Sequence, residues 1–310
     1  MPTRALLVVN SKSRSGALGF DVALERLAAH GVEVFEQKLD NAAGIDALIR
    51  RHQHDVDCVL IGGGDGSLNA AAEALADTGL PLGVLPMGTA NDLARTLHIP
   101  TDLELAADVV GTGVLHAIDL ARVNGRCFFN VANIGLGVHV AHHLSAAMKQ
   151  RWGVLSYARS LIMAFRSSQP FHADICCDGR HQRVRSIQIA VGNGRHYGGG
   201  MTVAEEASID DHQFFLYSIE PRGWCELLRF APAFRSGRFE ERHPVYLTQG
   251  RQIRIETRKP MIVTADGEPV AHTPASFEML ADAVRVFVPT SYFNHDFDHD
   301  RQEVPHAAQG

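Results

Sequence analysis

Apolar residues in the first third of the chain form short unbroken runs that alternate with segments of helical spacing. An unbroken run is typical of a strand covered on both faces, whereas apolar residues every three or four positions indicate an amphipathic helix. We expect strands at 4–10, 32–37, 57–63 and 81–86, and helices at 15–31, 44–55, 67–79, 89–99 and 101–113. This alternation predicts a doubly wound parallel sheet.

Near residue 117 the pattern changes to short β-like runs separated by turn residues. Two of these runs flank the dipeptide Asn124-Gly125, which is a strong hairpin signal. A helical stretch is expected at 139–168, and further β-like runs follow it. This half of the chain predicts an antiparallel β-sandwich.

The two patterns together predict an α/β + β fold with two domains. The α/β domain spans residues 1–122 and the β-rich domain spans residues 123–290. Residues 291–310 form a polar, aperiodic tail, which either packs back on the first domain or is disordered.

Composition narrows the function classes only slightly. The chain has 310 residues, 45% of them hydrophobic, and a net charge of -6, which argues against nucleic-acid binding by bulk electrostatics. Its five cysteines include no C-x-x-C pair, so we expect neither a disulfide framework nor a zinc site, in keeping with a cytoplasmic location. No apolar stretch approaches the ~20 residues of a membrane span, so any membrane contact is expected to be peripheral.

A glycine-rich turn ends the third predicted strand, where open α/β sheets bind ligands. It contains Gly62, Gly63, Gly64 and Gly66, interrupted by Asp65. Backbone amides in such a turn, together with the start of the next helix, can cradle a phosphate. Neither the P-loop nor the dinucleotide-binding fingerprint fits, because no Lys follows and the last glycine is missing. The alternative is a tight strand-to-helix turn without a ligand.

A second polar turn follows the fourth predicted strand. Gly88 provides the bend, Thr89 and Asn91 provide hydroxyl and amide groups, and Asp92 could orient a metal-bound water or cap the helix. Taken alone, the turn reads better as a capped helix start. Two polar turns after adjacent strands favour a phosphate site.

These motifs resemble the catalytic domain of the diacylglycerol kinase family, and most closely the soluble bacterial, YegS-like lipid kinases. The matching stretches are NSKSRSG (10–16), GGDGSLNA (63–70), GTAND (88–92), IDL (118–120), GGGM (198–201) and DGE (266–268). They occur in the family's order and span nearly the whole chain. The resemblance implies a fold like that of NAD kinases and diacylglycerol kinases, with the active site in the cleft between a nucleotide-binding and a lipid-binding domain.

The resemblance also implies the residues of the site, with ATP and Mg²⁺ as cofactors. Catalysis would fall to Glu268, the general base, to Asp65 and Asp92 near the Mg²⁺, and to Asp119, in a polar network that reaches a second metal site. The nucleotide would be bound by Asn10, Lys12, Gly62, Gly63, Gly64, Asp65, Gly66, Ser67, Leu68, Asn69, Gly88, Thr89 and Asn91. The second metal would be held by Asp211 and the carbonyls of Ser208 and Gln213.

Three positions depart from the family pattern. Ser11 replaces a proline, Ala70 replaces a glutamate, and His212 replaces a glycine in the turn of the second metal site. If that turn needs a positive φ, losing the glycine weakens the metal site.

Two basic segments with aromatic residues could reach a lipid surface. They lie at 148–165 and 221–239, and both could equally pack against the protein. We therefore expect a cytoplasmic protein that associates peripherally with the inner membrane face, and we leave a homodimer open.

The resulting hypothesis is a kinase that transfers the γ-phosphate of ATP to diacylglycerol or a related lipid. A catalytically weak regulator that binds nucleotide or lipid, and an NAD-kinase-like enzyme acting on a small molecule, are the alternatives.

Overall fold

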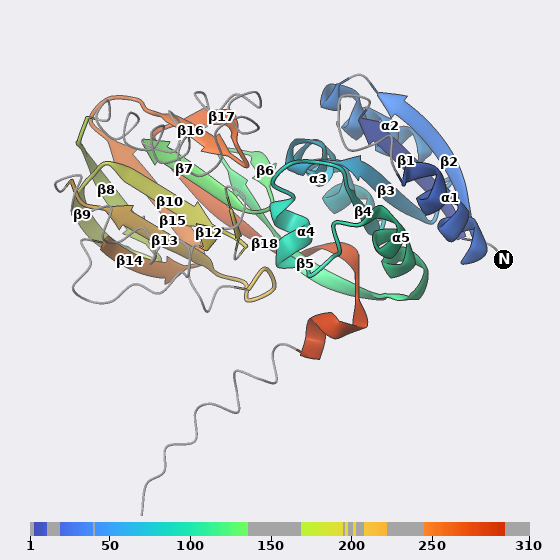
Figure 1. Cartoon of the computed structure of the whole chain (residues 1–310). Helices are drawn as coiled ribbons and strands as arrows, with labels where there is room; N and C mark the ends of the chain where they lie inside the picture. Colours follow the sequence, from blue (N-terminus) through green and yellow to red (C-terminus); the bar gives the residue numbers. More distant parts are fainter. Residues whose placement is uncertain are drawn as a thin grey trace, which may run out of the picture.

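The computed structural model describes residues 3–10, 19–39, 41–135, 169–194, 196–197, 201–202, 208–221 and 245–294. The helix expected at 139–168, most of the GGGM motif and most of the polar tail lie outside these residues. Within them, the molecule has two parts that lie side by side, one rich in helices and one built of strands (Figure 1).

The first part is a parallel sheet flanked by helices. Its strands are β1 (Thr3–Asn10), β2 (Val32–Leu39), β3 (Cys58–Gly63) and β4 (Leu82–Pro86), in the order β2-β1-β3-β4. Its helices are α1 (Phe20–Ala29), α2 (Ile45–His52), α3 (Asp65–Thr78), α4 (Asp92–Thr96) and α5 (Leu103–Thr112), with the short η1 (Ala42–Gly44). Every residue of β3 and β4 is buried, as the unbroken apolar runs predicted.

Two helices near the glycine turns differ from the prediction. Helix α3 begins at Asp65, two residues before the expected start, so Asp65 and Gly66 belong to its first turn. Helix α4 is a single short helix within the expected 89–99. Left-handed residues confine it, because Asn91 has a φ of 49° before its first residue and His98 has a φ of 56° after its last turn.

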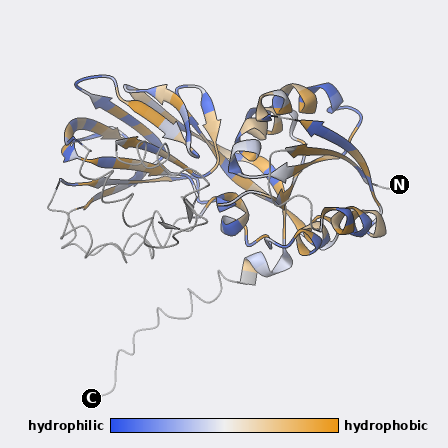
Figure 2. Cartoon of the chain, turned by 45° about the horizontal axis from the view of Figure 1, so that its top comes forward, coloured by the Kyte–Doolittle hydropathy of each residue, from blue (hydrophilic) through white to orange (hydrophobic). Residues whose placement is uncertain are grey.

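The second part is a sandwich of two sheets, so the predicted fold class is confirmed. The smaller sheet has the order β14-β13-β10-β7-β16-β17, and the larger sheet continues through β15, β8 and β9. Hydrophobic and hydrophilic stretches both occur on the strands of this part (Figure 2). Strand β8 buries every second residue from Ala173 to Cys177, whereas all of β10 is buried. Their bounds are β6 (Arg126–Phe128), β7 (Val131–Gly135), β8 (Phe171–Cys177), β9 (Arg180–Ser186), β10 (Gln188–Gly192), β13 (Phe214–Ile219), β14 (Val245–Gly250), β15 (Gln252–Thr257), β16 (Ile262–Ala265) and β17 (Glu268–His272), with a separate pair β11 (His196–Tyr197) and β12 (Met201–Thr202).

Two long strands, β5 (Val114–Val123) and β18 (Ala275–Val288), run through both parts. They pair antiparallel to each other, and β18 also lies between β4 of the first part and β15 of the second. The carboxyl half of β18 contributes Val284 and Val286 to the first hydrophobic core, and its amino half contributes Phe277 to the second. The two parts therefore share one continuous sheet, and the division expected after residue 122 stays a prediction.

Hairpin turns in the second part have the chemistry that the sequence indicated. Asn124-Gly125, Asp178-Gly179 and Asp266-Gly267 each place two successive residues at positive φ, the mark of a type I′ turn. The four described cysteines are free. In the described part of the chain, no helix is both long and apolar enough to cross a membrane.

The shared strand β18 makes a testable contribution to stability. Phe277 is 2% exposed and packs edge-on against Phe128 and Phe214, with ring centroids 6.4 and 6.2 Å away. We expect Phe277→Ala to lower the free energy of unfolding by about 3–5 kcal/mol, because it leaves a cavity between the two sheets. Chemical denaturation measures the loss. Leu247→Ala, at a 47% exposed position, is the control, and an equal loss in both variants would contradict the assignment.

Candidate active site

The two polar turns lie against each other at the carboxyl edge of the sheet. Gly63 pairs with Pro86 across β3 and β4, and the Met87 amide donates to the Gly63 carbonyl at 2.9 Å. A Cβ on Gly88 would lie 2.5 Å from the Cα of Gly64. Only glycine allows the two backbones to come this close, so the Gly64–Gly88 contact explains both glycines.

Asn91 holds the second turn in shape from within. Its Oδ1 accepts a hydrogen bond from the Gly88 amide at 2.9 Å, and its Nδ2 donates to the Gly88 carbonyl at 3.2 Å. Asn91 is buried and left-handed. Its amide group therefore fixes the peptide of Gly88, and contact with a nucleotide stays a prediction for this residue.

Asp65 ties the first turn to the second. Its Oδ1 accepts the Leu93 amide at 3.2 Å, at the start of α4. Burial raises the pKa of Asp65. Backbone amides at the start of α4, including that of Asn91 just before it, oppose this rise because they stabilise the charged carboxylate. Asp92, the first residue of α4, is 6% exposed. The structure thus brings the two predicted carboxylates to one edge of the sheet.

The other predicted nucleotide residues divide into exposed and buried groups. Thr89 and Gly66 are exposed, and a Cβ on Gly66 would meet nothing within 4 Å. Ser67 and Leu68 are buried, so Leu68 can reach a ligand only through its backbone. Asn69 is half-buried, and its Oδ1 has no hydrogen-bond partner in the described structure. The side chain of Asn10 and all of Lys12 lie outside the described residues.

The hairpin between β16 and β17 carries a second acidic group. The carboxylate of Asp266 accepts the amides of Phe129, Asn130 and Val131 at 2.9, 3.1 and 3.0 Å. Burial raises the pKa of Asp266 to about 7; the amide donors oppose this shift, and the charge of Asp65 adds to it. The clamp ties the turn between β16 and β17 to the segment between β6 and β7.

Glu268 lies two residues beyond Asp266, at the start of β17. It is exposed, and it pairs with Ala265 across the type I′ turn. The turn and the clamp on Asp266 fix the backbone that carries Glu268, while its side chain stays accessible. An accessible carboxylate on a rigid hairpin suits a general base.

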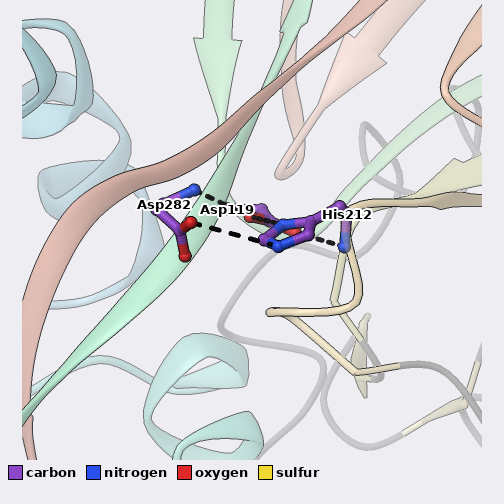
Figure 3. A group of neighbouring side chains, drawn as sticks. All are labelled: Asp119, His212 and Asp282. Atoms are coloured by element: carbon purple, nitrogen blue, oxygen red, sulfur yellow. Dashed lines mark hydrogen bonds and ion pairs between the residues drawn. The ribbon is translucent and has the colours of Figure 1, made fainter.

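Asp119 lies at the boundary between the two cores and is 1% exposed. Its carboxylate accepts the amide and the Nδ1 of His212 at 2.7 and 2.8 Å, and the amide of Asp282 at 2.9 Å (Figure 3). The Nε2 of His212 lies 4.0 Å from Asp282. The three side chains are close enough to hold a metal ion, but three protein donors already occupy Asp119, so the group acts as a clamp.

The turn predicted to hold a second metal spans residues 208–213 and contains His212. Asp211 accepts the Ser208 amide at 3.0 Å and the Gln213 amide at 2.9 Å. Burial raises the pKa of Asp211 to about 6, and the charges of Asp119 and Asp210 add to the rise. His212 has a φ of 59°, so the turn keeps the left-handed conformation that a glycine would adopt.

Two of the acidic sites, the pair Asp65 and Asp92 and the turn at Asp211, are chemically suited to bind a cation. Burial disfavours the charged forms of Asp65 and Asp211, and a divalent ion would stabilise those forms. Asp65 and Asp92 could hold Mg²⁺ together with phosphate oxygens, and Asp211 could hold a second ion with neighbouring carbonyls.

Sequence reasoning missed several residues of this region. The sequence motif DGE points to Glu268, and nothing in the spacing indicates the clamp of Asp266 on residues 129–131. His116 bonds to Asp210 at 2.7 Å, and Asp282 joins the group around His212. These contacts join segments more than 60 residues apart, and local patterns do not contain them.

The Gly64–Gly88 contact can be tested with one methyl group. Gly88→Ala would force the two turns apart, so we expect at least a tenfold loss of ATP affinity together with a lower Tm. Gly66→Ala is the control for folding, because its methyl group meets open space and alanine favours a helix. Isothermal titration and thermal unfolding measure both effects. An unchanged Gly88→Ala protein would show that the turns need not touch.

The clamp around Asp119 predicts an order of stability at position 212. His212→Ala keeps the left-handed backbone and loses the ring hydrogen bond, so we expect Tm to fall by about 2–4 °C. His212→Gly also loses the ring but relieves the backbone strain, and it should recover part of this loss. A glycine variant less stable than the alanine variant would contradict the strain at this position.

Two protein-family models match this chain, one over each part. The family model of the diacylglycerol kinase catalytic domain matches residues 4–123. The model of the YegS C-terminal NAD kinase beta sandwich-like domain matches residues 130–288.

Curated relatives match over most of their length. A protein named probable lipid kinase YegS-like from Klebsiella pneumoniae is 31% identical, over 92% of this chain and 96% of its own. The diacylglycerol kinase of Bacillus subtilis is 30% identical, over 76% of this chain and 78% of its own.

Solved structures show the same fold. One Bacillus anthracis protein has a TM-score of 0.80 and 24% identity, covering 94% of this chain and 96% of its own. A diacylglycerol kinase from the same organism has a TM-score of 0.72 and 21% identity, covering 94% and 98%. The resemblance drawn from the sequence motifs is confirmed: the chain belongs to the diacylglycerol kinase catalytic-domain family, together with the bacterial lipid kinases named YegS-like.

Proposed function

We propose that the chain transfers the γ-phosphate of ATP to a hydroxyl group of diacylglycerol or a related lipid. Membership of the family makes the chain an ATP-dependent kinase, and the lipid is the proposed part. The observation that carries the proposal is the close packing of the two polar turns, in which the Met87 amide donates to the Gly63 carbonyl at 2.9 Å and Gly64 touches Gly88. The backbone amides of these turns and the carboxylates of Asp65 and Asp92 at the same edge of the sheet suit a nucleotide phosphate with its metal ion.

The nucleotide phosphates would bind at the paired turns. Exposed backbone at Gly66, the start of α3 and the hydroxyl of Thr89 offer hydrogen-bond donors to phosphate oxygens. Gly62, Gly63, Gly64 and Gly88 would act by allowing the close backbone approach. Asn10 and Lys12 stay proposed contacts from the N-terminal motif.

Charge neutralisation would come from Asp65 and Asp92 through Mg²⁺. When bound there, Mg²⁺ would neutralise part of the charge that develops on the phosphate oxygens during phosphoryl transfer. The role of this chain's carboxylates is to hold the ion at the junction of the two turns. Asp92 is buried and Asp65 is half-buried, which strengthens their interaction with a cation.

Glu268 would serve as the general base. The lipid hydroxyl oxygen forms a bond to the γ-phosphorus, the bond to the β-phosphate oxygen breaks, and the hydroxyl proton passes to Glu268. Phosphoryl transfer depends mainly on positioning and charge neutralisation, so the rigid hairpin matters as much as the carboxylate. Asp119 and the proposed ion site of Asp211, Ser208 and Gln213 would hold the second part in register.

Access to a lipid would require a peripheral contact with the cytoplasmic face of a membrane. The proposed contact segments, at 148–165 and 221–239, lie outside the described residues except for Pro221. Their basic and aromatic residues suit an anionic membrane surface. A homodimer stays open.

Label transfer tests the proposal directly. The purified protein is incubated with γ-labelled ATP, Mg²⁺ and mixed micelles of diacylglycerol and detergent, and the products are separated by chromatography. We expect labelled lipid from the wild type and at least a hundredfold lower kcat from Glu268→Gln, because general-base catalysis contributes about 10²–10⁴-fold.

Glu33→Gln is the matched control, since Glu33 is also an exposed glutamate on a strand, at the far side of the first part. Its kcat should stay within twofold of the wild type. Tight ATP binding without labelled lipid would reject the kinase proposal for diacylglycerol and favour a regulator. Label on a soluble nucleotide acceptor would favour an NAD-kinase-like activity.

A further inference from the structure

Asn193 lies where the end of β10 meets β5 and the segment that follows β6. It follows β10 and is 1% exposed. Its Nδ2 donates to the Asp119 carbonyl at 3.0 Å and to the Phe129 carbonyl at 2.8 Å. Its backbone amide donates to the Asn130 carbonyl at 2.8 Å. One side chain therefore joins β5 to the segment that follows β6.

Both bonded carbonyls belong to residues that also take part in a hydrogen bond to a carboxylate. The Asp119 carboxylate fixes the turn at His212 and the bulge at Asp282. Phe129 begins the run of amides that clamps Asp266. The hydrogen bonds thus form an unbroken path from the His212 turn, through Asn193, to the hairpin that carries Glu268.

We propose that Asn193 is a positioning residue, which sets the place of the DGE hairpin relative to the first part. The inference rests on the proposed function, since it gives that hairpin its catalytic role. A primary amide is suited to this task, because it offers two N–H donors on one nitrogen without adding a charge. Aspartate has the same size but would turn oxygen atoms toward both carbonyls.

An independent feature distinguishes this network from ordinary core packing. The Oδ1 atoms of Asn193 and Asn130 are buried, and neither accepts a hydrogen bond from the described residues. Such groups weaken a fold. Residues that break a local rule of stability tend to lie at functional sites, which fits a role in positioning.

The test compares Asn193→Asp and Asn193→Ala with Ser186→Ala. Ser186 is fully buried in the same part; its hydroxyl oxygen lies 2.8 and 3.1 Å from the carbonyls of Gln188 and Ile219, to one of which it donates, and it accepts the Gln188 amide at 3.1 Å. It is thus a matched control that loses similar bonds away from the hairpin. We expect both Asn193 variants to lower the kcat of lipid phosphorylation 10- to 100-fold, with the KM for ATP within twofold. Ser186→Ala should lower Tm but keep kcat within twofold.

Hydrogen–deuterium exchange supplies a readout that needs no activity. The amides of residues 129–131 should exchange faster in the Asn193 variants than in the wild type or in Ser186→Ala. If Asn193→Ala does not fold, the isosteric aspartate variant decides the comparison. An unchanged kcat, or a loss of kcat that Ser186→Ala shares, would overturn the proposal.

Failure of the proposed function is distinguishable from failure of this inference. A wild type that labels no lipid rejects the function, and with it any effect of Asn193 on catalysis. The exchange of residues 129–131 then still shows whether Asn193 holds the hairpin, and unchanged exchange would reject that as well.

Discussion

The structure depends on one buried carboxylate at the boundary of its two cores. A charged group in the interior is costly unless hydrogen bonds compensate it, and Asp119 obtains all three of its bonds from segments distant in sequence. Two of them come from His212 and one from Asp282, and both of these residues are left-handed. A turn of the second part and a bulge of the shared strand must therefore adopt strained conformations to satisfy Asp119. This requirement fixes how the two parts meet.

The proposed reaction centre has a tightly packed side and a solvent-exposed side. Where the two turns touch, glycines and the folded-back side chain of Asn91 leave no space for a methyl group. On the exposed side, Gly66 faces open space and Glu268 is accessible. The packed side sets the geometry, and the open side is where substrates can enter. Each part contributes acidic groups that fit a cation, Asp65 with Asp92 in the first part and Asp211 in the second.

The sequence predicted much of the fold because its signals are local. The apolar runs located β3 and β4, and the dipeptides Asn124-Gly125 and Asp266-Gly267 located hairpin turns. The order of the turns along the chain also brought Asp65 and Asp92 together correctly. The sequence could not indicate that β18 lies beside β4, because strand pairing across 200 residues leaves no local pattern. The hydrogen bonds of Asp266 to residues 129–131 and those of Asn193 could not be predicted for the same reason.

The position of β18 has a consequence for how the protein is made. It is the last strand of the described chain, yet it occupies an inner position in the sheet, beside the fourth strand to be synthesised. Until it arrives, β4 presents an unpaired apolar edge, which is the kind of surface that recruits other strands and aggregates. The ribosome delivers the first part before β18, so this part cannot complete its own sheet alone. Folding of the two parts is therefore expected to be one cooperative event that follows the synthesis of β18, and neither part is an independent module.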